Sequence, residues 1–96
     1  MAVGDVVSSL SASVANNGTV NIQPGSGAEW VIQNLYYGGA VEFYLVNGAN
    51  TIKFDSDAAI GSRLLYAFRC TNTQYIQVKN VSGGAVHIAY DGLITK

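Results

Sequence analysis

Apolar and polar residues alternate along most of the chain, which is the period of a β-strand with one buried face. In the run YIQVKN, for example, Ile76 and Val78 fall on one face and Gln77 and Lys79 on the other. Comparable extended runs occupy residues 19–23, 29–37, 40–46, 51–55, 63–70, 75–80 and 85–91. No stretch of ten residues has a helical pattern. The sequence therefore predicts an all-β fold.

Turn residues separate these runs. Asn17-Gly18 and Asn47-Gly48 suit hairpin turns that need a positive φ. The polar stretch 55–62 is predicted to be the longest connection. The N-terminal run 5–15 fits either a helix or a strand, and its Ser and Val content favours a strand.

About eight short antiparallel strands in one small domain predict a two-sheet, jelly-roll-like sandwich. We expect a single domain over residues 1–96, with residues 1–17 as an extended N-terminal arm or an edge strand. The side chains predicted to fill its core are Trp30, Ile32, Phe43, Phe54, Phe68, Ile76, Val78, Ile88 and Tyr90.

The run 63–70 differs from the others because it is apolar on both faces. Leu64, Tyr66 and Phe68 fall on one face with Cys70, and Leu65 falls on the other. One small sandwich has only one core, so the second face predicts cover by another subunit.

Composition points the same way. The 96 residues are 49% hydrophobic and 11% charged, against a charged share of about 25% in typical domains. A small chain with few charges gains much from an oligomeric interface. Tyrosine is favoured at such interfaces, so Tyr44, Leu65 and Tyr75, assigned to outer strand faces, are the candidate interface residues of a homo-oligomer.

Several partners and locations are disfavoured. The five cations are scattered, whereas phosphate binding needs a cluster, so no nucleic acid is expected. No apolar run approaches the ~20 residues of a membrane span. The N-terminus lacks the basic region of a secretory signal, which predicts synthesis in the cytoplasm without a signal peptide.

Candidate chemistry is sparse. His87 alternates with Val86 and Ile88 and is interpreted as a polar strand residue. Cys70 is the single cysteine, which precludes an intrachain disulfide, and it is expected to be buried. Asp55 and Asp57 begin a calcium-loop-like stretch that lacks the later ligands. We expect no catalytic site, no metal site and no cofactor.

The stretches AEWVIQNLYYGGAVEFYLV (28–46) and YIQVKNVSGGAVHIAYDG (75–92) resemble small all-β proteins of tailed bacteriophages. That class comprises head decoration or cement proteins and small tail or fibre modules, which are often trimeric. The resemblance implies a non-enzymatic virion component that assembles as an oligomer, with a trimer expected. It also implies contact with the major capsid protein or another virion protein.

An alternative within the same resemblance is a carbohydrate- or receptor-binding module of a tail or fibre. Its candidate ligand contacts are Trp30, Tyr36, Tyr37 and Asp91. The location of the aromatic residues separates the two hypotheses. Burial at a subunit interface favours the capsid role, and an exposed groove with polar neighbours favours the binding module.

Overall fold

A computed structural model describes residues 2–11 and 13–96. Within these residues the chain forms nine strands and no helix, which confirms the predicted all-β sandwich. The strands are β1 (Val6–Leu10), β2 (Thr19–Ile22), β3 (Glu29–Tyr37), β4 (Val41–Asn47), β5 (Asn50–Asp57), β6 (Gly61–Arg63), β7 (Phe68–Thr71), β8 (Gln74–Asn80) and β9 (Ile88–Ile94).

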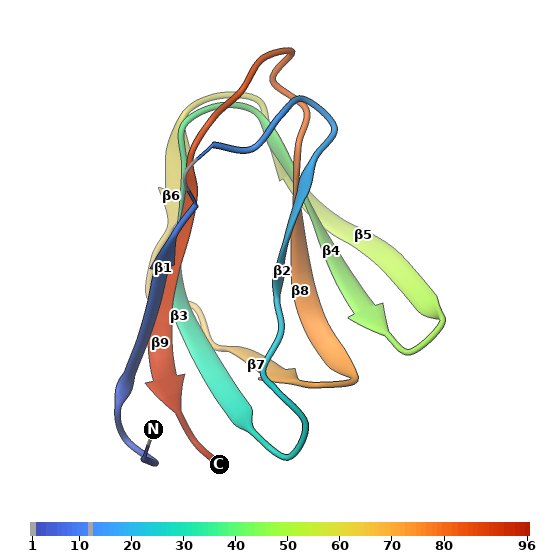
Figure 1. The fold of residues 1–96 in the computed structure, drawn as a ribbon. Helices are drawn as coiled ribbons and strands as arrows, with labels where there is room; N and C mark the ends of the chain where they lie inside the picture. The colour runs from blue at the N-terminus through green and yellow to red at the C-terminus, as the bar shows by residue number, and fades with distance from the viewer. Residues whose placement is uncertain (1, 12) are drawn as a thin grey trace.

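The strands form two antiparallel sheets that face each other (Figure 1). One sheet has the order β1-β9-β3, with β6 and β7 both pairing with the far edge of β3. The other has the order β2-β8-β4-β5. If β6 and β7 count as one interrupted strand, the orders become 1-8-3-6 and 2-7-4-5, which is the winding of a jelly roll.

The core lies between the sheets and is built from alternate residues of each strand. Ile32, Phe43, Ile76, Val78 and Ile88 are buried as predicted. The predicted core residues Trp30, Phe68 and Tyr90 are partly buried against this cluster.

Phe54 departs from the prediction because it is 43% exposed. It lies on the edge strand β5, at a point where the register to β4 shifts between Phe43 and Tyr44. Its ring contacts Phe43 and Phe68, with ring centroids 6.2 and 5.9 Å away. An edge strand leaves one side of such a ring without cover.

The N-terminal segment forms the edge of the five-stranded sheet. Val6–Leu10 pairs with β9 along its whole length. The two ends of the chain lie at the same end of the molecule (Figure 1).

Gly92 lies close to the backbone of β3. A Cβ at this position would overlap the carbonyl oxygen of Val31 and would lie 2.8 Å from Cα of Ile32. The register between β3 and β9 shifts at this point, because Ile32 pairs with Gly92 and Asn34 with Asp91. Gln33 is therefore an extra residue in β3, which defines a β-bulge.

The opposite edge of β3 is irregular at the same level. Ile32 pairs with Phe68 and Leu35 with Arg63, so residues 64–67 stand opposite only Gln33 and Asn34. The prediction of one continuous strand over 63–70 is wrong for this reason. The polar connection predicted for 55–62 is also shorter than expected, because β5 continues to Asp57 and β6 begins at Gly61.

Asn80 is a fully buried polar residue at the end of β8. Its Nδ2 donates to the carbonyl oxygens of Val14 (2.8 Å) and Gly84 (2.7 Å), and its Oδ1 accepts from the amide of Ser82 (2.9 Å). One side chain thus binds the backbone of two loops. The Val14 carbonyl also accepts from the Val86 amide (3.0 Å), and the Gly84 carbonyl also accepts from the Ser82 hydroxyl (3.0 Å).

Substituting Gly92 with Ala should reduce the free energy of unfolding by about 2–4 kcal/mol, because the added methyl group overlaps backbone atoms that cannot rotate away. Urea denaturation measures the change. Gly25→Ala is the matched control: nothing lies within 4 Å of its Cβ position, and the expected effect is within about 0.5 kcal/mol. Equal effects at the two positions would contradict the close approach.

Asn80→Ala should cost about 1–3 kcal/mol, because it removes three hydrogen bonds of a buried side chain and leaves the Ser82 amide without its partner. Asn47→Ala is the control, since Asn47 is exposed and its one side-chain bond, to Gln74, is 3.2 Å long. A loss at Asn80 no larger than that at Asn47 would show that water replaces the buried amide.

Candidate functional site

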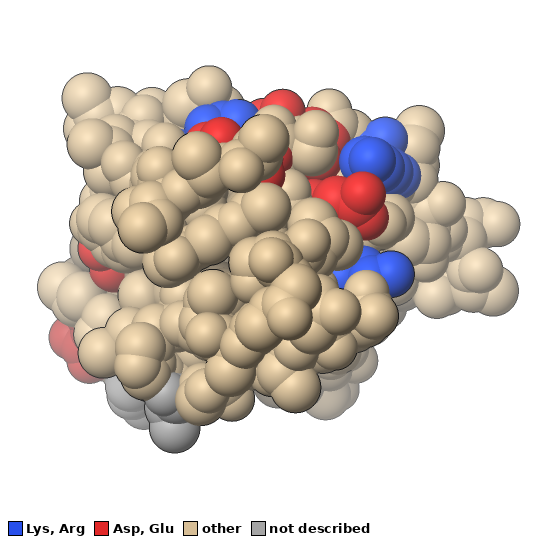
Figure 2. Space-filling view, turned by 90° about the horizontal axis from the view of Figure 1, so that it is seen from above, with Lys and Arg blue, Asp and Glu red and all other residues tan. Residues whose placement is uncertain are grey.

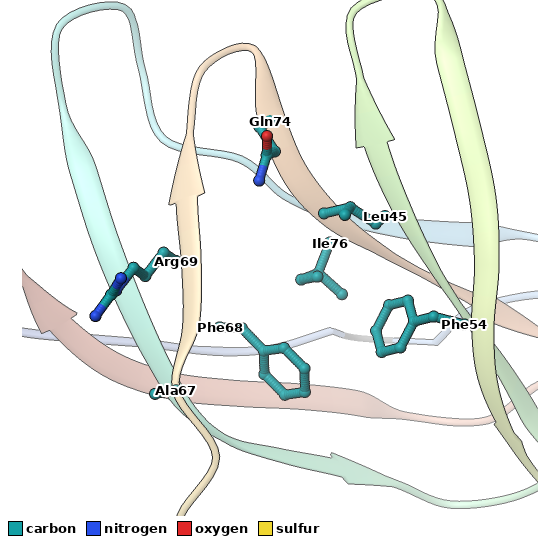
Figure 3. A pocket seen from close by; sticks show the side chains of 7 residues that line it. All are labelled: Leu45, Phe54, Ala67, Phe68, Arg69, Gln74 and Ile76. Atoms are coloured by element: carbon teal, nitrogen blue, oxygen red, sulfur yellow. The ribbon is translucent and has the colours of Figure 1, made fainter.

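An apolar cleft opens between the two sheets on the side where β5 faces β7. Its volume is about 330 Å³. Leu45, Phe54, Phe68 and Ile76 line it with apolar side chains, and Ala67, Gln74 and Arg69 complete its rim. Figure 3 shows the two phenylalanine rings and Ile76 converging on the cleft, while the guanidinium of Arg69 points away from it.

A chain of aromatic rings forms one wall of the cleft. It runs from Phe43 in the core through Phe54 and Phe68 to Tyr66, whose ring stacks on Phe68 at a centroid distance of 5.4 Å. The aromatic contacts therefore continue from the core to exposed positions.

Residues 64–67, which we call the Leu65 loop, lie next to this wall. Leu65 is 91% exposed and has a φ of 61°. Non-glycine residues seldom adopt this conformation, because Cβ crowds the backbone. Two hydrogen bonds hold it in place: the Leu65 amide donates to Asn34 Oδ1 (3.0 Å) and the Tyr66 amide to the carbonyl of Gln33 (2.9 Å).

Asn34 connects the Leu65 loop to the outer face of the five-stranded sheet. Its Nδ2 donates to Asp91 Oδ1 (2.6 Å), and the hydroxyl of Tyr36 donates to Asp91 Oδ2 (2.8 Å). The hydrogen bond to Asp91 raises the pKa of Tyr36. Both carboxylate oxygens of Asp91 therefore have a partner within the chain.

A row of apolar residues crosses this outer face next to Asp91, and Arg69, which pairs with Val31, lies at the end of the row. Val6 pairs with Leu93 and Leu93 with Val31, which places the three side chains in one row. Leu10, on the same face of β1, is 70% exposed.

A polar cluster lies where the chain crosses from β5 to β6. Arg63 forms ion pairs with Asp55 (3.0 Å) and Asp57 (3.2 Å), and its Nη1 donates to the hydroxyl of Tyr37 (2.9 Å). That hydroxyl donates to Asp57 Oδ2 (2.6 Å). The guanidinium also lies 5.5 Å from the centroid of the Phe43 ring. These contacts join the two sheets at the corner.

The cluster shifts the titration of its members. Hydrogen bonds from Arg63 lower the pKa of Asp55, and the bond from Tyr37 lowers the pKa of Asp57. Burial and then the bond to Asp57 raise the pKa of Tyr37 to about 12. Asp55 and Asp57 serve an ion-pair network within the fold.

The three candidate interface residues lie on different sheets. Tyr44 (β4) and Tyr75 (β8) belong to the four-stranded sheet, where Tyr44 donates to Glu42 Oε1 at 2.6 Å and Tyr75 packs against the core cluster. Leu65 belongs to the edge of the other sheet. Of the three, Leu65 is by far the most exposed.

The four candidate ligand contacts are also divided. Tyr36 and Asp91 lie together on the outer face of the five-stranded sheet. Trp30 and Tyr37 are on its inner face: Trp30 packs 6.4 Å from the ring of Tyr90, and Tyr37 is buried with its hydroxyl on Asp57. The structure therefore does not bring these four residues into one groove.

His87 and Cys70 occupy separate environments. His87 is exposed, with Nδ1 2.8 Å from the carbonyl oxygen of Ser11. Cys70 is buried, and burial raises the pKa of its thiol. Among residues 2–11 and 13–96, no three His, Cys, Asp or Glu side chains are grouped so that they could hold a metal ion.

The cleft and the Leu65 loop were not predicted from the sequence. The apolar run on both faces of 63–70 did indicate an uncovered surface. Gly92, inside β9, was a further signal, because an isolated strand glycine often marks a bulge. Neither signal reveals that the loop would sit beside a cleft.

Comparison with models of known protein families finds no match, and comparison with curated proteins finds none either. In the described part of the chain no helix has the length and apolar character needed to cross a membrane.

The lowered pKa values of Asp55 and Asp57 predict an acid-dependent loss of stability. Their contribution is complete above the unfolded-state pKa of about 3.9 and is lost as the pH falls through the folded-state values. Arg63→Met should lower stability at neutral pH and flatten the decline in urea midpoint below about pH 4. Arg69→Met, which removes an exposed cation, should leave that decline unchanged. Parallel pH profiles for wild type and Arg63→Met would refute the assignment.

Proposed function

We propose that this chain is a non-enzymatic structural protein that self-associates through its exposed apolar surface. The observation that carries the proposal is the Leu65 loop, which presents a leucine almost entirely to solvent beside an apolar cleft. Other large apolar side chains near it in sequence or across the cleft are also exposed: Ile52, Phe54, Ile60, Leu64 and Tyr66. Grouped exposed apolar residues are typical of interaction sites.

The size and charge of the surface support self-association. The chain has an accessible surface of 5202 Å². A specific interface of about 800 Å² per partner would cover about 15% of it. On the face seen from above, most charged side chains lie toward the top and right of the view, with acidic patches at the left edge, and the centre of the face is neither acidic nor basic (Figure 2). An interface at the centre of this face requires little removal of charge from water.

The biological setting we propose is the surface of a tailed-phage head, where the protein would act as a decoration protein bound to the major capsid protein. The resemblance of residues 28–46 and 75–92 to small virion proteins supports it. Jelly rolls occur in viral capsid proteins and in lectins, so the winding is compatible with this role without specifying it. A trimer is the oligomer that the resemblance implies.

Light scattering coupled to size exclusion tests self-association. The expected mass at micromolar concentration is a multiple of 10.1 kDa, and three times that value for the trimer. A monomer throughout this range would overturn the proposal. For the setting, antibody-gold labelling of purified virions should mark the head at regular positions. Labelling of the tail alone would exclude the decoration role.

A carbohydrate-binding role is the second candidate, and Tyr36 beside Asp91 favours it. An exposed tyrosine ring next to a carboxylate is a common sugar contact, and Tyr36 is 39% exposed. Saturation-transfer NMR with a panel of host-surface glycans would detect binding. A signal lost in Tyr36→Ala and retained in Tyr44→Ala would place the glycan on this face, whereas no signal from any glycan would dismiss this candidate.

A further inference from the structure

The geometry points to a knob-and-cleft contact: we propose that Leu65 of one copy inserts into the apolar cleft of a second copy. The inference rests on the proposed self-association and identifies the surfaces that perform it. The knob is the Leu65 loop, residues 64–67. The cleft is the space lined by Leu45, Phe54, Phe68 and Ile76.

The knob is held in position before any partner arrives. The Leu65 amide is bound to Asn34 Oδ1, and Asn34 is itself bound to Asp91. The chain therefore holds a leucine in the left-handed region and exposes its side chain, which are two unfavourable features in an isolated monomer. Burial of the Leu65 side chain against a second copy removes the cost of its exposure to water. The loop is already held in the conformation that presents this side chain.

The cleft is apolar and large enough to admit an aliphatic side chain. Its volume of about 330 Å³ is at the lower end of the range of about 300–1,000 Å³ seen for small-molecule sites. Ile76 forms a buried part of its lining, and the Phe54 and Phe68 rings flank it. No charged group points into it, since the Arg69 side chain is directed outward (Figure 3). A carboxylate or phosphate ligand would find no partner there.

Knob and cleft are adjacent on the same molecule, because Ala67 ends the Leu65 loop and also lines the cleft. Each copy can therefore present a knob and receive one in the same region of its surface. Reciprocal exchange gives a two-fold pair, whereas a one-way contact gives a ring if the rotation closes and a filament if it does not. The nearby cation Arg63 is already paired with Asp55 and Asp57, and the guanidinium of Arg69 points away from the cleft.

Complementation between two variants tests the contact. Leu65→Asp disables the knob and leaves the cleft intact, whereas Phe54→Lys disables the cleft and leaves the knob intact. Each variant alone should associate at least about 30-fold more weakly than wild type, as expected for a central interface residue. Mixed together, they should form hetero-oligomers, because the intact knob of one fits the intact cleft of the other and the introduced carboxylate can meet the introduced ammonium group. Native mass spectrometry with one variant labelled with ¹⁵N identifies them.

Leu10→Asp is the matched control, since Leu10 is also an exposed leucine but lies on the edge strand β1, outside the knob and the cleft. It should associate like wild type. Thermal melting establishes that each variant is folded. If Phe54→Lys does not fold, Gln74→Lys replaces it, because Gln74 is an exposed residue of the cleft lining that lies on β8, outside the Leu65 loop.

The outcomes distinguish failure of the knob-and-cleft contact from failure of self-association. Oligomerisation that survives Leu65→Asp, or that is lost only in Leu10→Asp, overturns the knob-and-cleft contact and leaves self-association standing. Two dissociated variants that do not recombine indicate a knob-to-knob contact and also overturn it. A monomeric wild type overturns both proposals, and a lipid or other small apolar molecule retained in its cleft would then be the occupant.

Discussion

The close approach of Gly92 to the Val31–Ile32 backbone governs the shape of the five-stranded sheet. Because this glycine has no Cβ, β9 can lie against β3 where the register shifts by one residue at Gln33. Asn34 then pairs with Asp91, and its side-chain oxygen accepts the amide of Leu65. The interruption between β6 and β7 and the exposure of the Leu65 loop thus accompany one bulge in the central strand, as is common for bulges near functional surfaces.

The open side of the sandwich is stabilised by polar contacts at one corner and apolar contacts beside it. The Arg63 network connects β5, β6 and β3 where the chain changes sheets. One cation and two carboxylates are paired with each other in this network. Because the chain has only eleven charged residues, few others remain for the neighbouring cleft side of the sandwich. Arg69 is the one charged residue that lines the cleft, and its guanidinium points away from it.

The sandwich and most buried positions could be predicted from the sequence, because strand alternation depends only on which residues face a core. Ile32, Phe43 and Val78 follow that rule. The failures occur where a neighbouring strand decides the outcome. Residues 63–70 read as one strand, and only the bulge at Gln33 explains their division. The partial exposure of Phe54 depends on a register shift between β4 and β5. The sharing of Asn80 between two loops depends on contacts with Val14, distant in sequence.

The balance between the two functional candidates depends on what each surface would gain from a partner. On the outer face, both oxygens of Asp91 are already bonded to Asn34 and Tyr36. Each oxygen can accept a second hydrogen bond, but Asp91 already has a partner at both oxygens, so the net gain from a sugar hydroxyl is small. The Leu65 loop and the cleft have no such competing bonds at their apolar side chains. Covering them removes apolar area from water without breaking an existing interaction, which is the favourable term that drives most protein association. This difference therefore favours the proposal of self-association over that of carbohydrate binding.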